Sequence, residues 1–296
     1  MIDFVNKRVE TIFEDFKKNV ESREGEVCKL KGFNFMGDNL PEYSDPLTQQ
    51  FYLLKYLCGY FAEYTSIYRN ITGKGFLDRY KVLSIGCGCG LDLWGLKHAC
   101  NERFSENKID RYTGIDRVSW NYRETFGLEN IEYRDIEVDD IKSFEDGEYN
   151  IIIFPKSIGE FSESTFNHLK DLIFDTKFAG NKVVFVASIR KARFKDDFLK
   201  VDEIREIFTK KGYKLIDVYD HTELTELDDR CSVSDIVSGV EYSKEVDEYF
   251  DNLYKLCKEY QKTGRVCDSA CINNLTRKRV STMSQANYQI LYLERQ

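Results

Sequence analysis

The chain has 296 residues, 42 % of them hydrophobic and 14 % aromatic, enough for one large domain or two small ones with a substantial core. Its net charge of −8 argues against a protein that binds nucleic acid by broad phosphate neutralisation, although a local basic groove stays compatible with it. No apolar run reaches the ~18 residues of a membrane span. Residues 1–16 lack a signal-peptide pattern, and nine cysteines, an odd number, favour reduced thiols. We therefore expect a cytoplasmic protein that does not insert in a membrane.

The first 75 residues are predicted to be mainly helical. Residues 1–21 carry apolar side chains at helical spacing, and residues 22–45 are mixed and expected to be irregular. Asp45 and Pro46 have the pattern of a helix start, and this second helix runs to about Asn70. Its tyrosines recur at every fourth residue, which suits either packing against the main domain, the favoured interpretation, or an aromatic wall over a substrate pocket. We expect residues 1–75 to form an N-terminal helical cap.

The stretch 81–96, KVLSIGCGCGLDLWGL, combines an apolar strand, a glycine-rich turn and a helix. Glycines let the backbone turn sharply and approach a ligand, and the following helix directs its free N–H groups and positive end at that ligand. The turn therefore predicts a binding loop, with a ligand-free glycine turn as the alternative.

The glycine spacing separates the possible ligands. Gly86, Gly88 and Gly90 take the first, third and fifth positions, whereas a dinucleotide fingerprint needs glycine at the sixth, which here is Leu91. A Walker loop is excluded because no Gly-Lys-Ser/Thr follows. The pattern resembles the first motif of class I S-adenosylmethionine (SAM)-dependent methyltransferases. NAD-dependent oxidoreduction is disfavoured by Leu91.

A second motif lies at the end of the strand 111–116. Its last residue, Asp116, falls where a sheet of this kind places a side chain beside the ligand crevice, and a carboxylate there can accept hydrogen bonds from both ribose hydroxyls. Asp116 follows Gly90 by 26 residues, longer than the usual ~20, and we attribute the excess to an extra turn. A solvated loop aspartate is the alternative.

Strands alternate with helices along the rest of the chain. We expect helices from Ser162 to Lys177, from a cap at Asp202 to Gly212, and from Ser243 to about Tyr260. The expected strands are 81–86, 111–116, 131–134, 149–154, 182–188, 213–219 and 287–294. This order resembles the class I methyltransferase fold: an α/β, three-layer, Rossmann-like doubly wound sheet of seven strands, mostly parallel with an antiparallel last strand. Residues 76–296 would form the SAM-binding domain, with a helical insertion at about 222–286.

The resemblance implies SAM as cofactor and a set of residues around it. Asp135 would contact the adenine amino group, with the backbone of Ile136 beside the ring. One departure concerns Ser84, since many family members carry there an acid that orders the methionine end of the cofactor. The implied cofactor-binding residues are Ser84, Gly86, Cys87, Gly88, Gly90, Asp116, Asp135, Ile136, Phe154 and Pro155.

The loop after the strand 149–154 would face the methyl group. It lacks both the Asn/Asp-Pro-Pro-Tyr motif that holds an exocyclic amine and the Pro-Cys pair used on cytosine carbon 5. Lys156, Ser157 and Glu160 stand there instead, and each could orient or deprotonate a substrate. A purely structural turn is an equal alternative.

Other reactive residues are expected to be structural. Cys257, Cys267 and Cys271, with Cys231 upstream, lack a Cys-x-x-Cys pair, so we expect free buried thiols and no metal. The histidines, including His221, are isolated. The basic run 277–279 is expected to be a solvated turn, although it could touch a polyanion.

The sequence therefore predicts a SAM-dependent methyltransferase acting on a small molecule or a protein side chain. RNA is the alternative acceptor and rests on the basic run 277–279 alone. A SAM-binding regulatory or scaffold protein without catalysis is the alternative from another class. The acceptor atom and the oligomeric state are not predicted.

Overall fold

The computed structural model describes residues 1–22, 27–30, 33, 41–189, 194–220, 233–240, 243–266 and 287–296. Internal contacts divide the chain into two compact units: unit 1 is Met1–Tyr60 with Ser232–Thr282, and unit 2 is Phe61–Cys231 with Met283–Gln296. The division falls inside helix α3 (Pro46–Lys74). It also groups much of the expected insertion with the N-terminal helices, because their apolar faces pack together.

Unit 2 is built on one seven-stranded sheet with the order β3-β2-β1-β4-β5-β7-β6. The strands are β1 (Tyr80–Ile85), β2 (Ile109–Asp116), β3 (Ile131–Asp135), β4 (Ile151–Pro155), β5 (Lys182–Ile189), β6 (Tyr213–Asp220) and β7 (Asn287–Arg295). The pairings from β3 through β5 are parallel, and β7 lies antiparallel between β5 and β6. The expected seven strands and the antiparallel last strand are confirmed.

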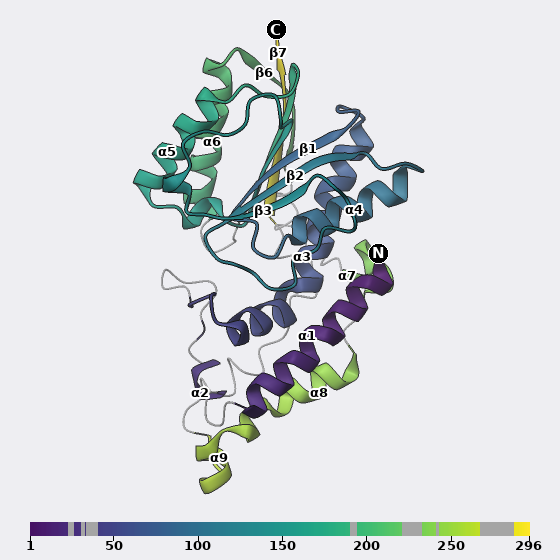
Figure 1. Cartoon of the computed structure of the whole chain (residues 1–296), viewed down its shortest axis with the longest axis vertical. Coiled ribbons are helices and arrows are strands. Elements are labelled where there is room, and N and C mark those ends of the chain that lie inside the picture. Colours follow the sequence, from purple (N-terminus) through teal and green to yellow (C-terminus); the bar gives the residue numbers. More distant parts are fainter. Residues whose placement is uncertain are drawn as a thin grey trace. The chain divides into compact units, whose positions relative to one another are not determined.

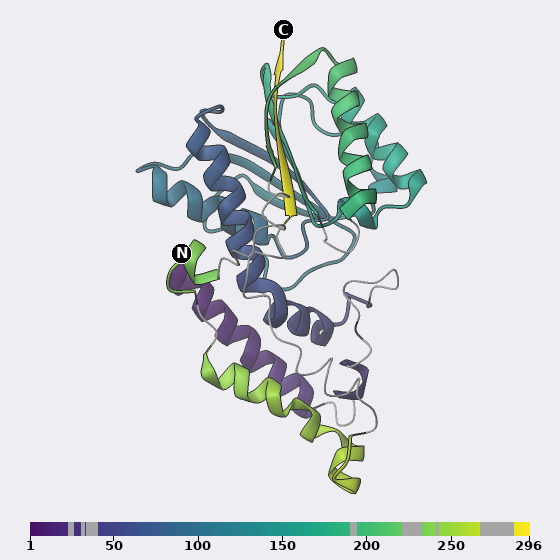
Figure 2. The same cartoon turned by 180° about the vertical axis from the view of Figure 1, so that it is seen from behind.

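Helices cover both faces of this sheet (Figures 1 and 2). Helices α5 (Glu163–Asp175) and α6 (Phe194–Lys210) lie on one face, and α4 (Leu91–Arg103) lies on the other with the part of α3 that belongs to unit 2. The apolar runs of β4 and β5 are buried, as strands sandwiched between helix layers must be. The three-layer arrangement is therefore the one expected.

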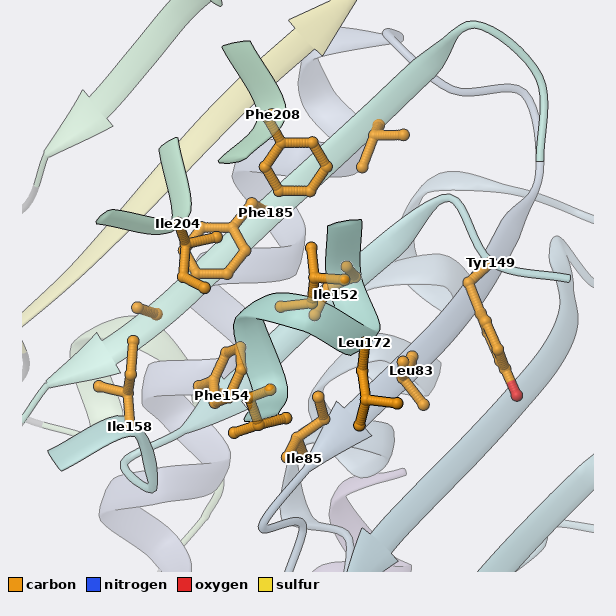
Figure 3. Close-up of a cluster of buried hydrophobic side chains, with 14 of the residues drawn as sticks. Leu83, Ile85, Tyr149, Ile152, Phe154, Ile158, Leu172, Phe185, Ile204 and Phe208 are labelled. Carbon is orange, nitrogen blue, oxygen red and sulfur yellow. The ribbon is translucent and has the colours of Figure 1, made fainter. Parts of the chain in front are cut away.

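One core cluster lies between the sheet and helices α5 and α6 (Figure 3). Phe154 of β4 and Phe185 of β5 are fully buried, with ring centroids 5.8 Å apart, and Phe208 of α6 packs on Phe185. This cluster keeps the ends of the parallel strands in register, which positions the loops that follow them.

Two helix boundaries in unit 2 depend on local sequence. Ser162 caps α5 by accepting a hydrogen bond from Thr165 N, as its sequence predicts. The expectation that Asp202 caps a helix is wrong, since α6 begins at Phe194 and Asp202 lies inside it. Val201 extends the apolar spacing upstream of Ile204, so burial keeps the preceding turns helical.

Unit 1 contains α1 (Ile2–Ser22), α2 (Val27–Leu30), α7 (Val233–Ile236) and α8 (Lys244–Asn252). Phe16 of α1 stacks on Phe250 of α8 at 5.5 Å, so the N-terminal helix and the insertion share a core (Figures 1 and 2). The expected single helix 243–260 is instead α8, a 3-10 segment at Leu253–Leu256 and α9 (Lys258–Thr263). None of the described helices is long and apolar enough to cross a bilayer.

Candidate functional site

The glycine loop connects β1 to α4, and its three glycines adopt the left-handed backbone conformation. Gly86, Gly88 and Gly90 have φ of 72°, 58° and 83°. The N–H groups of Gly86 and Cys87 donate to the carbonyl of Ile115 at 2.8 and 3.0 Å, which ties the loop to the end of β2. The loop is thereby fixed at the carboxyl edge of the parallel strands, where this class of sheet binds ligands.

Two of these glycines have different surroundings. A Cβ added at Gly86 would lie 2.8 Å from Ser157 Oγ and closer still to Ser157 Cβ, so this position has no room for a side chain. A Cβ at Gly88 would meet nothing nearer than the Trp120 ring at 3.7 Å. Gly86 is therefore needed for packing against the loop after β4, whereas Gly88 leaves its backbone open to approach.

Asp116 ends β2 and reaches across to the glycine loop. Its Oδ2 accepts from Gly88 N at 2.8 Å, and its Oδ1 accepts from Val118 N at 3.0 Å. Burial raises the pKa of Asp116, while those backbone hydrogen bonds act to lower it. Each carboxylate oxygen keeps a second lone pair, so the group can still accept from a diol beside Gly88.

Asp135 lies beside Asp116 at the end of the neighbouring strand. The two residues are in register, and Ile136 N donates to Asp116 O at 2.9 Å. Asp135 forms an ion pair with Arg123, whose Nε also donates to Gly88 O at 3.3 Å. Burial acts to raise the pKa of Asp135, but the hydrogen bonds from Arg123 and Ser119 lower it overall. The arrangement brings the expected adenosine contacts to one edge.

The departure at Ser84 is accompanied by a buried carboxylate nearby. Asp92, in the first turn of α4, is fully buried and accepts from the Tyr112 hydroxyl at 3.0 Å. The Ser84 hydroxyl is close enough to this carboxylate to act on its pKa, but it forms no hydrogen bond with the described residues. Burial raises the pKa of Asp92 to about 6, against the lowering effect of Ser84 and Tyr112. An acid therefore lies beneath the loop, supplied from the helix and not from β1.

The loop after β4 is held from within unit 2. Ser157 is buried and donates to the carbonyl of Ile85, the last residue of β1. Lys156 adopts a left-handed φ of 62°, and its ammonium pairs with Glu63 of α3 at 2.9 Å. Phe154 points into the core, and Glu160 is exposed in a short 3-10 turn. Lys156 and Ser157 thus adjoin the glycine loop, while the side chain of Phe154 does not.

The sheet has the order β3-β2-β1-β4-β5-β7-β6, and Asp116 contacts the glycine loop at the carboxyl ends of its parallel strands. The fold is that of the class I methyltransferases. The seventh strand enters antiparallel between β5 and β6, as the resemblance implies.

No family model and no curated protein matches the sequence. The chain is similar in structure to the plantazolicin methyltransferase BpumL in complex with SAH, at 12 % identity over 97 % of this chain and 100 % of that one, with a TM-score of 0.42. It is also similar to magnesium protoporphyrin IX methyltransferase from Synechocystis PCC 6803, with bound SAM, at 12 % identity over 95 % and 97 %, with a TM-score of 0.40.

A third similar structure is geranyl diphosphate C-methyltransferase from Streptomyces coelicolor A3(2), at 10 % identity over 78 % of this chain and 79 % of that one, with a TM-score of 0.38. Likenesses this distant are no guide to the acceptor of the present chain. The chemistry of this protein is therefore inferred from its own residues.

Sequence reasoning missed Glu63 and Asp92. Glu63 is the one charged residue between Lys55 and Arg69, in an otherwise apolar or neutral stretch, and this isolation was the available signal. Asp92 similarly stands among Leu91, Leu93 and Trp94. A charge on a buried helix face needs a partner, so both positions could have been noted as sites of interest.

Several expectations concern residues outside those that the structure describes. These are Cys231, Cys267, Cys271, His221 and the basic run 277–279. Cys257 is described and buried, and its sulfur lies 3.1 Å from the thiol of Cys28 within unit 1. Among the described residues, no group of three or more His, Cys, Asp or Glu side chains could hold a metal ion.

Proposed function

We propose that this protein transfers the methyl group of SAM to a small molecule or to a protein side chain. The observation that carries the proposal is the contact between Asp116 and Gly88 N at 2.8 Å, which puts a carboxylate at the carboxyl edge of the parallel strands against a left-handed glycine loop. A nucleoside cofactor needs this combination, because the carboxylate can accept the ribose hydroxyls and the glycine backbone lets the cofactor come close.

Each of the surrounding residues has a role in this proposal. Asp116 would accept the ribose hydroxyls, and Asp135, with the backbone of Ile136, would hold the adenine. The glycine loop would allow close approach of the cofactor, with Ser84 and Asp92 supporting the loop from beneath. SAM supplies an activated methyl sulfonium, so the protein has chiefly to align a nucleophile with it and take up its proton.

The net charge of −8 supports a small molecule or a protein side chain over a nucleic acid as acceptor. RNA as acceptor, and a cytoplasmic location, remain predictions. A SAM-binding regulatory protein is the competing function. It is favoured by the loop after β4, where Lys156 and Ser157 are both committed to internal contacts.

Two measurements test the proposal. Calorimetry should detect binding of SAM and of S-adenosylhomocysteine with micromolar Kd. Incubation with methyl-labelled SAM and an unfractionated cell lysate should then transfer label to small molecules or protein. The absence of SAM binding would overturn the proposal. Binding without transfer would favour the regulatory function, and label in RNA would replace the acceptor class.

A further inference from the structure

Glu63 forms a buried charged cluster with residues at the ends of β4 and β5. Its Oε1 accepts from Lys156 Nζ at 2.9 Å and also from the hydroxyl of Ser188. Lys156 Nζ makes a second hydrogen bond to the carbonyl of Ile189 at 3.3 Å. The side chains of Glu63 and Lys156 are only 3 % and 8 % exposed, so the pair is almost wholly removed from water.

A pair buried this deeply contributes little to the stability of a fold. Removing two charges from water costs several kcal/mol per ion, and apolar residues of the same volume often stabilise a protein as well or better. The stretch around Glu63 is apolar or neutral, so packing alone gives no reason for an acid there. A chemical role would account for Glu63 where packing does not.

The cluster adjoins the glycine loop. Ser157, the residue after Lys156, touches Gly86 so closely that no side chain could replace the glycine hydrogen. Ser188 is in register with Pro155, so both cluster strands end at the edge that carries the loop. Lys156 stands at a left-handed φ of 62°, a strained conformation for lysine, and strain of this kind gathers at functional sites.

The two oxygens of Glu63 are used unequally. Both hydrogen bonds end on Oε1, and no described residue donates to Oε2. An ionised carboxylate oxygen has two acceptor positions, so Oε2 can take a further donor. Lys156 neutralises the pair as a whole, which favours an uncharged O–H or N–H donor over a second cation.

We infer that Glu63 is the catalytic base of the proposed methyl transfer and that the acceptor atom is a hydroxyl oxygen or an amine nitrogen. The inference rests on the proposed function and deepens it. Lys156 and Ser188 are positioning residues, because they hold Oε1 and leave Oε2 to accept the proton of the acceptor. An acceptor carbon without a removable proton would have no use for this group.

The step balances as follows for an acceptor X–H. A lone pair on X forms the bond to the methyl carbon, and the carbon–sulfur bond breaks with its electron pair remaining on sulfur, which becomes a neutral thioether. The X–H proton moves to Glu63 Oε2 and is later released to water. A positioned base of this kind contributes about 10²–10⁴-fold to the rate.

The decisive variant is Glu63→Gln, which keeps the shape of the side chain and removes its basicity. With methyl-labelled SAM and the lysate, kcat should fall about 100-fold or more, while the KM for SAM and the calorimetric Kd stay within about twofold of wild type. Glu63→Asp should restore part of the rate, and Ser188→Ala should lower kcat only about three- to tenfold.

Glu102→Gln is the matched control. Glu102 of α4 pairs with Arg69, which lies on α3 like Glu63, but both side chains of this pair are more than a third exposed. The same carboxylate-to-amide change there should leave kcat unaltered. A thermal melt of each variant checks that the fold survives.

The acceptor class has its own readout. Transfer of a carbon-13 methyl group from labelled SAM should give a product whose methyl carbon resonates as an O-methyl or N-methyl group. A carbon-bound methyl would overturn the inference, as would a folded Glu63→Gln variant with wild-type kcat. Failure of the wild-type protein to bind SAM would instead overturn the proposed function itself.

Discussion

The two sides of the candidate site are held together in different ways. On the cofactor side, Asp116 binds backbone N–H groups of Gly88 and Val118, 28 and 2 residues away. On the acceptor side, Glu63 binds side chains that are 93 and 125 residues distant. A backbone contact over a short span tolerates many neighbouring side chains, whereas the acceptor cluster exists only when three particular side chains meet.

Because of this difference, we expect substitutions on the two sides to change different properties of the protein. In the proposed function, the cofactor side binds SAM through main-chain groups and one carboxylate. Changes to its residues should therefore affect the affinity for SAM and the stability of the fold. The acceptor side should affect the rate of transfer at unchanged SAM affinity, as tested by Glu63→Gln. A cofactor-side variant that altered only kcat would break the comparison.

The largest effect is expected for Asp116→Ala. The change removes both oxygens that we propose to accept the ribose hydroxyls, and it leaves the N–H groups of Gly88 and Val118 without their carboxylate. Calorimetry should show the Kd for SAM raised by more than about 100-fold. Asp110→Ala, at the other end of the same strand, removes only a partly exposed pair with Arg79 and should leave the Kd unchanged. Equal affinities for Asp116→Ala and wild type would contradict the assigned role.

The next effect concerns packing between the two sides. Gly86→Ala would force a methyl group into Ser157 at a left-handed φ, with an expected loss of about 4 kcal/mol in the free energy of unfolding. Gly88→Ala meets only the backbone strain and should cost about 1–2 kcal/mol. Urea denaturation of the two variants measures both values. Equal losses would show that Ser157 does not restrict Gly86.

The third effect is a pH dependence that originates in Asp92. Because burial raises its pKa from 3.8 unfolded to about 6 folded, the folded protein binds the proton more tightly. This favourable contribution is complete below pH 4 and is lost as the pH rises to about 6, a change of about 3 kcal/mol. Asp92→Asn removes the titrating group.

The measurement is the difference in unfolding free energy between wild type and Asp92→Asn, by urea denaturation at pH 4 and pH 7. The variant should gain about 2 kcal/mol relative to wild type between the two pH values, since at pH 4 the unfolded carboxyl is already partly protonated. Asp140→Asn, at an exposed carboxylate, should show no such gain. A pH-independent difference for Asp92→Asn would mean that its carboxyl titrates normally in the folded protein.

The sequence predicted the strands and the glycine loop because their signals are local. The apolar run of β4 and the spacing of Gly86, Gly88 and Gly90 are complete within a few residues, and the structure has them where expected. Asp202 shows the limit of local signals. Aspartate is a residue type that often caps helices, but α6 begins at Phe194 because the turns before Asp202 pack against the core.

Glu63 and the division of the chain show the other limit. Nothing near Glu63 reveals that Lys156 and Ser188 reach it, because a contact across 93 or 125 residues depends on the topology of the sheet. The grouping of residues 232–282 with the N-terminal helices likewise depends on rings such as Phe16 and Phe250 finding each other. Such pairings are properties of the folded chain.

The position of β7 has a consequence for the order in which the protein folds. Strand β6 joins the sheet only through β7, and the two are separated along the chain by a segment that belongs mostly to unit 1. During synthesis, β5 therefore presents an unpaired edge until that segment has emerged and β7 follows it. Pairings of such long sequence separation form slowly, so the nascent sheet is exposed to aggregation until β7 closes the gap.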